Sequence, residues 1–168
     1  MNDTPRIYVR CLASYNAGRL YGQWIDATDA DCIKQEIQEM LESSPEKGEE
    51  WALHDYENFG SISVSEFEDI ERVAELGRLV AEHGRAFAAY ADHIGSDHAT
   101  AEGFQDAFCG EWESERAYAE DLFDDLYGHE VPEYIANYIN YEAFAHDLFL
   151  SDSFSVECPG GVYVFRNC

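Results

Sequence analysis

The chain has 168 residues and carries 35 Asp and Glu against ten Lys and Arg, for a formal net charge of -25 at pH 7. The acids are spread evenly, since residues 1–56, 57–112 and 113–168 hold 11, 12 and 12 of them. A chain this acidic and without a basic patch is not expected to bind DNA directly, because like charges repel. A mean hydropathy of -0.41 and the lack of a long uncharged apolar run exclude a membrane span.

The composition also excludes a disordered acidic chain. Apolar types make up 46% of the residues and aromatic ones 14%, whereas disordered acidic segments lack the apolar surface that offsets chain entropy. A chain of this length can bury a sizeable core, in one domain or in two or three small ones. The first residues show no basic region followed by an apolar stretch, so we expect a cytoplasmic protein without a signal peptide.

The first 60 residues predict a small α+β unit. β-Branched and aromatic residues over 7–12 indicate a strand, and residues 19–25 indicate its hairpin partner across a turn. Residues 26–31 supply the acids typical of a helix start, and apolar residues then recur with helical period over 33–41. A third strand is predicted over 50–56.

Helices alone are predicted from residue 65 to about residue 150. Ser65 and Glu68 match a capping box at the start of the first of them. Glycines predict breaks near residues 84, 95 and 110, and a further break is expected over 127–132. The apolar face of the first helix is Phe67, Ile70, Ala74, Gly77 and Ala81, and that of the last is Tyr134, Tyr138, Tyr141, Ala145 and Leu148.

These elements predict an α+β fold with a small N-terminal antiparallel sheet and helix, a central helical part, and C-terminal helices with a short β-hairpin. The hairpin is formed by strands over 154–158 and 162–165, on either side of a Pro-Gly-Gly turn. We expect an N-terminal α+β unit over 1–60, a central helical unit over 61–110, and a C-terminal helical unit with the terminal hairpin over 111–168.

Patterns of metal-binding or catalytic residues are absent from the sequence. None of the six histidines occurs at the spacing of a known zinc or di-iron motif. Asp26, Asp29 and Asp31 hint at a calcium loop, but Lys34 stands where such a loop needs Gly. We therefore expect no enzymatic activity, no catalytic residue, no metal and no cofactor.

The five cysteines are odd in number and form no C-x-x-C pair, which indicates reduced thiols. Cys11, Cys32 and Cys109 lie in apolar patterns. A free cysteine in such a pattern packs as a small hydrophobic side chain, and we expect the same of these three.

Acidic residues are dense in a helix that is predicted to begin near Glu113. Within it Glu120 and Asp124 form a like-charge pair four residues apart, and Asp121 and Asp125 form another; each pair destabilises a helix by about 0.2–0.5 kcal/mol. The rise from Glu113 to Asp125 is about 18 Å, or about one carboxylate per 3 Å, whereas one DNA strand carries a phosphate about every 3.4 Å. We therefore hypothesise that the folded surface imitates the phosphate backbone of DNA.

Other interpretations of the charge remain open. A solvated acidic face explains most single clusters of acids, and adaptation to high salt accounts for an acidic chain with two lysines beside eight arginines. An acidic adaptor that sequesters a basic nucleoid or histone-like protein is the alternative from a different functional class. A small hydrolase without a recognisable motif is a third possibility.

Several segments of the chain occur in the order that is typical of one family. They are Tyr8-Val9 through Tyr15-Asn16-x-Gly18, Gly22-x-Trp24, Trp51-Ala52-Leu53-His54-Asp55-Tyr56-Glu57, Val131-Pro132-Glu133, and Asn137-Tyr138-Ile139-x-Tyr141 through Asp147-Leu148. Together with the charge, this set resembles the ArdA family of antirestriction proteins over nearly the whole chain. The resemblance implies an elongated, three-part α+β homodimer, joined through its C-terminal parts, whose acidic surface mimics bent B-form DNA. It also implies a partner, the methyltransferase core of type I restriction-modification enzymes, whose occupied DNA-binding groove leaves an incoming mobile genetic element uncut.

Two groups of residues are candidates for function. The DNA-mimic surface is assigned to Glu66, Glu68, Asp69, Glu71, Glu75, Glu111, Glu113, Glu115, Glu120, Asp121, Asp124 and Asp125. The family's antirestriction segment maps onto residues 126–148, where Leu126, Tyr127, Gly128, Val131, Pro132, Tyr138 and Tyr141 are candidate contacts to the enzyme or to a second subunit. In this segment the chain departs from the family pattern at Asn140, where Asp is usual, and at His146, where Arg is usual.

Overall fold

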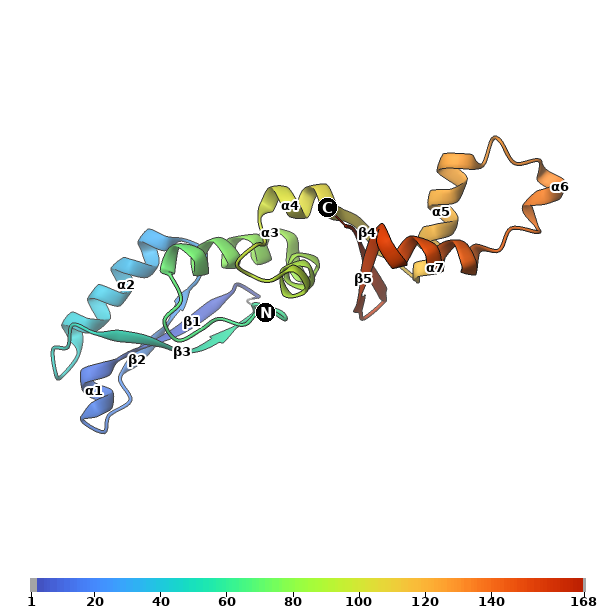
Figure 1. Ribbon diagram of the computed structural model, residues 1–168. Helices are drawn as coiled ribbons and strands as arrows, with labels where there is room; N and C mark the ends of the chain where they lie inside the picture. The colour runs from blue at the N-terminus through green and yellow to red at the C-terminus, as the bar shows by residue number, and fades with distance from the viewer. Residues whose placement is uncertain (1–2, 168) are drawn as a thin grey trace. The chain divides into compact units, whose positions relative to one another are not determined.

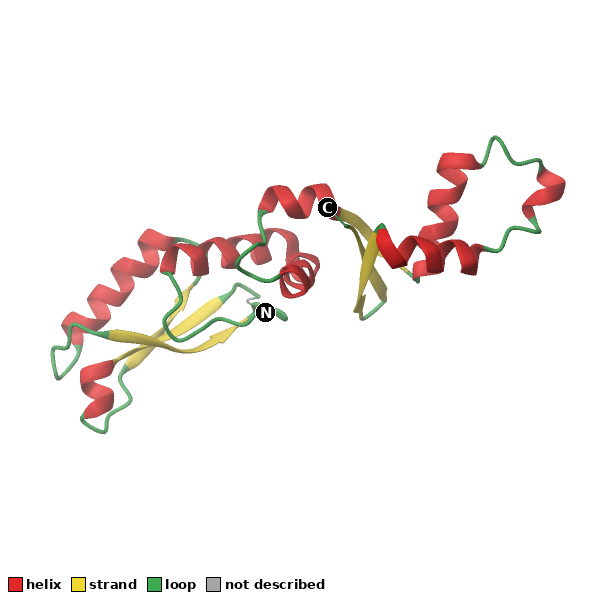
Figure 2. Cartoon of the chain, viewed as in Figure 1, coloured by secondary structure: helices red, strands yellow, loops and turns green. Residues whose placement is uncertain are grey.

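The computed structural model describes residues 3–167, and the chain divides into two compact units, Met1–Ala99 and Thr100–Cys168 (Figure 1). Both units combine helices with antiparallel strands (Figure 2), which confirms the predicted α+β class. The predicted three-part division, with boundaries after residues 60 and 110, stays a prediction. Among the described helices, none has the length and apolar character needed to cross a membrane.

A three-stranded antiparallel sheet organises the first unit. Its strands are β1 (Arg6–Cys11), β2 (Gly22–Asp26) and β3 (Trp51–Glu57), in the spatial order β2-β1-β3. The predicted hairpin and third strand are confirmed by this pairing. The connection between β1 and β2 is longer in structure than the predicted turn, because Leu12–Asn16 form the short helix α1.

Helix α2 (Ala30–Ser43) covers one face of this sheet (Figure 2). Asp29 caps the helix by accepting a hydrogen bond from the Cys32 amide at 2.9 Å. The helical period predicted over 33–41 is confirmed. The buried side chains are Ile33, Ile37 and Met40 on α2, and Ile7, Val9 and Cys11 on β1.

Buried polar contacts join α1 to β1 and to the end of α2. The hydroxyl oxygens of Ser14 and Ser44 lie 2.8 Å apart, and Ser14 also donates to Oε2 of Glu46 at 2.5 Å. Ser44 donates to the Cys11 sulfur at 3.3 Å. Both serines are buried, so these bonds satisfy hydroxyl groups whose desolvation would otherwise destabilise the fold.

Helix α3 (Ile70–Ile94) begins later than its sequence predicts. Asp69 caps it by accepting from the Glu71 amide at 3.1 Å. The expected cap, Ser65, instead donates to the Glu68 carboxylate at 3.0 Å within the preceding turn, so the capping-box prediction was wrong. Phe67, expected on the buried face of the helix, lies in that turn and is 75% exposed.

One glycine breaks α3, and one arginine fixes the segment that follows it. Gly84 has φ 67° and ψ -150°, which breaks the helical geometry where a break was predicted. Arg72, near the start of α3, donates to the carbonyl oxygens of Ser96 and Ala99, the latter at 2.9 Å. These bonds tie the segment after α3 back to its first turn.

Over residues 100–167, which the structure describes, the second unit contains a three-stranded antiparallel sheet and four helices. Its elements are α4 (Ala101–Ala107), β4 (Phe108–Trp112), α5 (Glu115–Tyr127), α6 (Glu133–Ala136), α7 (Tyr141–Ser151), β5 (Ser153–Cys158) and β6 (Gly161–Arg166). The strand order is β4-β6-β5. The terminal hairpin of β5 and β6 is thus confirmed, whereas the prediction of helices alone before it was wrong at β4.

Aromatic packing explains why residues 108–112 form a strand. Phe108 and Phe154 lie opposite Phe165 on either side of β6. The ring centroids of Phe108 and Phe165 are 5.4 Å apart, and those of Phe154 and Phe165 are 4.9 Å apart. Phe165 is fully buried, so the strand completes a core that these rings share.

The helical region of the second unit differs from the sequence prediction in two respects. Ser114 caps α5 by accepting from the Ala117 amide at 3.0 Å, so Glu113 precedes the helix that it was expected to begin. The last helix, predicted as one segment with Tyr134 to Leu148 on its apolar face, is interrupted between α6 and α7, because Asn140 caps α7 by accepting from the Ala143 amide at 3.1 Å. An Asp at this position, as is usual in the resembled family, is an equally good cap.

A substitution at Gly77 tests how closely α3 packs against the backbone near Ala27. A Cβ atom at Gly77 would lie 1.8 Å from the carbonyl oxygen of Ala27. Helix propensity alone predicts that Gly77→Ala stabilises the protein by about 1 kcal/mol. We expect a loss of about 1–3 kcal/mol instead, because α3 must move away from this backbone. Urea denaturation would measure this change in the free energy of unfolding, and a gain in stability would contradict the close contact between α3 and Ala27.

Candidate functional site

All 35 carboxylates lie among the described residues, and every one is exposed or half-buried. Buried carboxylates would need partners to offset their loss of hydration. The charge therefore forms a surface property of both units. Residues 1–99 carry 20 acids and 8 bases, a formal charge of -12, and residues 100–168 carry 15 acids and 2 bases, a formal charge of -13.

Ion pairs neutralise part of this surface. Within residues 3–167, eight carboxylates lie within 4.0 Å of a basic side chain. Six of them belong to the first unit and two, Glu120 and Glu142, to the second. Because both of the latter share the guanidinium of Arg116, the second unit has far less internal neutralisation than the first.

The N-terminal acidic cluster is formed by the five candidate residues of the first unit, Glu66, Glu68, Asp69, Glu71 and Glu75. Three of them are paired with bases, since Arg10 lies 2.9 Å from Glu66, Arg72 lies 2.7 Å from Glu75, and Lys34 donates to Glu71. The hydrogen bond that Lys34 donates is the largest cause that lowers the pKa of Glu71 to about 2. Glu68 and Asp69 are hydrogen-bonded but have no base within ion-pair distance in the described chain.

The C-terminal acidic cluster is formed by the seven candidate residues of the second unit, Glu111, Glu113, Glu115, Glu120, Asp121, Asp124 and Asp125. All lie on β4, on α5 or on the turn between them. Six are exposed and Glu120 is half-buried. Glu120 accepts from Nε of Arg116 at 2.7 Å, and the same guanidinium reaches Glu142 on α7 at 3.1 Å, which joins the two helices.

Acids of the C-terminal acidic cluster share one face of α5. At 100° per residue, Glu120, Asp121, Asp124 and Asp125 fall within an arc of about 140°. The buried residues Tyr118 and Ala119 fall outside this arc. From Glu115 to Asp125 the helix rises about 15 Å with five acids, or about one per 3 Å, so the later helix start leaves the predicted charge density unchanged.

This arrangement is unfavourable for the helix itself. Asp124 and Asp125 lie in the last turn of α5, which has no basic residue, although the partial negative charge at a helix C-terminus favours bases. The pKa of Tyr141 is raised by burial and then by the charges of Asp124 and Glu120, so the field of the cluster reaches α7. Such a sequence favours the exposed charge over the stability of the helix.

The antirestriction segment lies beside this cluster and exposes apolar side chains. Tyr138 is 86% exposed, and α6 contains no buried residue. Tyr141 and Tyr127 pack against Phe123 with ring centroids 5.7 and 5.3 Å away. The large apolar side chains exposed in this unit are Leu126, Tyr127, Tyr134, Ile135, Tyr138 and Leu150.

Other candidates in this segment have structural roles. Gly128 follows α5, where a Cβ atom would lie 2.4 Å from the Asp124 carbonyl oxygen. Pro132 occupies the N-cap position of α6, one residue before the first helical position that proline favours, and Val131 is half-buried before it. His146, the second departure from the resembled family, is exposed on α7.

Sequence reasoning missed a cluster around Arg10 on the sheet face opposite α2. Its guanidinium lies 2.7 Å from Nδ1 of His54, donates to Glu66 at 2.9 Å, and stacks over the Tyr15 ring at 4.1 Å. The alternation of Arg10 with the buried residues of β1 could have placed its side chain on the opposite face of the sheet. Its partners come from segments far apart in sequence, and the cluster reduces the availability of Glu66.

Neither a metal centre nor a disulfide is formed by the described residues. No group of three or more His, Cys, Asp or Glu among residues 3–167 is placed to hold a metal ion. Cys11 is buried and Cys109 half-buried, but Cys32 is exposed, so its predicted packing as an apolar residue was wrong. All three have free thiols, as does Cys158.

The chain matches one protein family over most of its length. The family model described as antirestriction protein (ArdA) matches residues 7–162 and so spans most of both units. No curated protein matches the chain. The family match includes all of the C-terminal acidic cluster and the whole antirestriction segment. The chain belongs to the ArdA family of antirestriction proteins.

Proposed function

We propose that this protein is an acidic DNA mimic that occupies the DNA-binding groove of type I restriction-modification enzymes and so blocks restriction of incoming DNA. Membership in the ArdA family implies an antirestriction function through interaction with a restriction enzyme, and the family is one of inhibitors rather than known enzymes. The observation that carries the proposal is the C-terminal acidic cluster, which presents one face of nearly unneutralised carboxylates at the expense of helix stability.

Binding in this proposal is electrostatic and competitive. Carboxylates at about the spacing of phosphates enter a groove lined by Lys and Arg, and no covalent bond is formed or broken. Release of counterions drives the association, as it does for nucleic acid itself, so affinity falls steeply with added salt. The protein acts in the cytoplasm, where the enzyme meets incoming DNA.

The two clusters contribute unequally. In the N-terminal acidic cluster, Glu66, Glu71 and Glu75 already face a base within the same unit. A partner's cation must compete with these bases for the carboxylates. In the C-terminal acidic cluster, Arg116 alone pairs with a member, Glu120, among the described residues. We therefore assign the larger share of the salt-dependent affinity to α5 and its flanking residues.

A homodimer forms through the antirestriction segment in this proposal. The exposed residues of α6 and its surroundings form an apolar surface that a monomer leaves in water. Patches of this kind mark protein contacts, and a self-complementary contact about a twofold axis is the commonest arrangement. On this view Tyr134 and Tyr138 belong to the subunit contact rather than to the enzyme contact.

Competition with DNA tests the main proposal. We expect the protein to displace a labelled duplex from a purified type I methyltransferase core. With at least six ion contacts, affinity should fall about 10³-fold between 50 and 200 mM salt. Fluorescence anisotropy would measure both effects. Salt-independent binding or undisplaced DNA would rule out mimicry, and preferential capture of a purified nucleoid protein would support the adaptor alternative.

Neutralising the acidic face of α5 separates function from stability. We expect the triple variant Asp121→Asn, Asp124→Asn, Asp125→Asn to lower the salt dependence of binding, by about 0.9 in the logarithmic slope per lost contact. Relief of like-charge pairs should raise stability by about 0.2–0.5 kcal/mol per pair. The matched variant Glu39→Gln, Glu42→Gln, Glu49→Gln removes the same charge from exposed sites outside the clusters. Equal effects of the two variants would contradict a specific surface.

Mutating the antirestriction segment tests the homodimer. We expect Tyr134→Ser with Tyr138→Ser to raise the dimer dissociation constant at least tenfold, because both rings leave water on association. Leu20→Ser, at an exposed apolar residue of the first unit, should have no such effect. Sedimentation equilibrium would measure both variants. An unchanged dimer, or a monomeric unmodified protein at high concentration, would refute this contact.

A further inference from the structure

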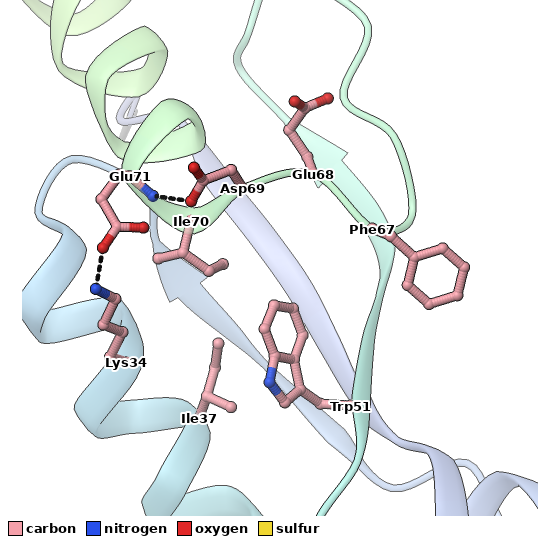
Figure 3. A pocket seen from close by; sticks show the side chains of 8 residues that line it. All are labelled: Lys34, Ile37, Trp51, Phe67, Glu68, Asp69, Ile70 and Glu71. Carbon is pink, nitrogen blue, oxygen red and sulfur yellow. Dashed lines mark hydrogen bonds and ion pairs between the residues drawn. The ribbon is translucent and has the colours of Figure 1, made fainter.

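One surface hollow of the first unit is lined by four apolar side chains together with three acids and one lysine. It has a volume of about 400 Å³ and lies between α2, the start of β3 and the segment that leads into α3. Figure 3 shows the side chains of Ile37, Trp51 and Ile70 pointing toward one another from these three elements. Their convergence gives the hollow an apolar floor with an indole ring in it.

Phe67 stands at the edge of the hollow (Figure 3) and remains 75% exposed. Its position is ordered, because the Glu68 amide donates to the Ser65 carbonyl oxygen at 3.3 Å and the Leu53 amide donates to the Glu66 carbonyl oxygen at 3.1 Å. The first bond closes the turn and the second ties it to β3. A phenyl ring held in water by an ordered turn, beside an apolar hollow, is the arrangement expected of a contact surface.

The charges around the hollow determine the kind of partner. Lys34 is the single base of its lining, and it already donates to Glu71. The lining holds three acids, Glu68, Asp69 and Glu71, so with Lys34 counted its net charge is about -2 (three minus one). Asp69 also caps α3, and Glu68 accepts from Ser65. The start of α3 is therefore no anion site, and the rim favours a cationic partner.

Charge complementarity selects among the occupants of such a hollow. A nucleic acid would bring phosphates against Glu68 and Asp69, and a second copy of this chain offers only ten bases beside 35 acids to a rim that favours cations. A protein segment with an apolar side chain between Lys or Arg residues meets both requirements. The apolar side chain contacts Trp51 and Phe67, and its basic neighbours face the acids of the rim.

We infer that this hollow is a docking site for a basic protein segment, which inserts an apolar anchor residue between Trp51 and Phe67. The site goes beyond DNA mimicry, because the phosphate backbone of a duplex offers no apolar floor beside its charges. Carboxylates alone would attract any basic groove. The anchor adds a contact that screening by salt does not weaken, and it distinguishes one basic partner from another.

Two synthetic peptides test the inference without a restriction enzyme. The probe is the amidated peptide Arg-Lys-Leu-Leu-Lys-Arg, and its matched control is Arg-Lys-Ser-Ser-Lys-Arg. We expect the leucine peptide to bind the ¹⁵N-labelled protein at least tenfold more tightly. It should shift the indole N–H signal of Trp51 while those of Trp24 and Trp112 remain in place, because neither of the latter lines the hollow.

Phe67→Ser should reduce affinity for the leucine peptide about tenfold and leave the serine peptide unaffected. The exposed ring makes unfolding of this variant unexpected, and a thermal melt checks it. Leu20→Ser, at another exposed apolar residue of the unit, should change neither affinity. Equal affinities for the two peptides, or an undisturbed Trp51 signal, would overturn the inference. These outcomes are independent of whether the protein displaces DNA from its enzyme.

Discussion

Mutual repulsion among 35 carboxylates is the constraint on which the rest of the structure depends. Since none of them is buried, the charge must be accommodated at the surface of two modest cores. In the first unit the core is mostly aliphatic, with α2 and α3 against the sheet. In the second it consists largely of aromatic rings around Phe165. These cores supply the apolar burial that opposes the repulsion.

The two units differ in how many of their carboxylates are paired with bases, and the proposed function depends on this difference. The first unit pairs Arg6, Arg10, Arg19, Lys34, Arg72 and Arg78 with carboxylates. The second has two arginines in all, and Arg116 is used to join α5 to α7. The two units keep similar numbers of unpaired carboxylates, 14 (20 minus 6) and 13 (15 minus 2), but the second unit carries its share on 69 residues and the first on 99. A partner rich in bases therefore finds the unneutralised charge at higher density on the second unit, while the first combines a lower density with an apolar hollow.

The local sequence was sufficient to predict those strands and helices whose buried residues recur with a regular period. Alternation in β1 and helical spacing in α2 both lie within one segment, and the sequence predicted them. Strand β4 was missed because its stability comes from β6, more than 50 residues later. The start of α3 was misplaced because Ser65 and Asp69 both match a cap, and only the fold shows which one bonds to the helix. Likewise, composition predicted an acidic surface, but the tertiary pairs Arg10–Glu66 and Lys34–Glu71 determine which acids are available.

The uncompensated acids at the end of α5 also separate the conditions for folding from those for binding. Electrolyte weakens repulsion within the helix and so favours the native state, while the same electrolyte weakens attraction to a cationic groove. Under the proposed electrostatic mechanism, the buffer in which this protein is most resistant to heat is a buffer in which it inhibits poorly. Purification or storage conditions chosen by melting temperature alone would consequently select against potency.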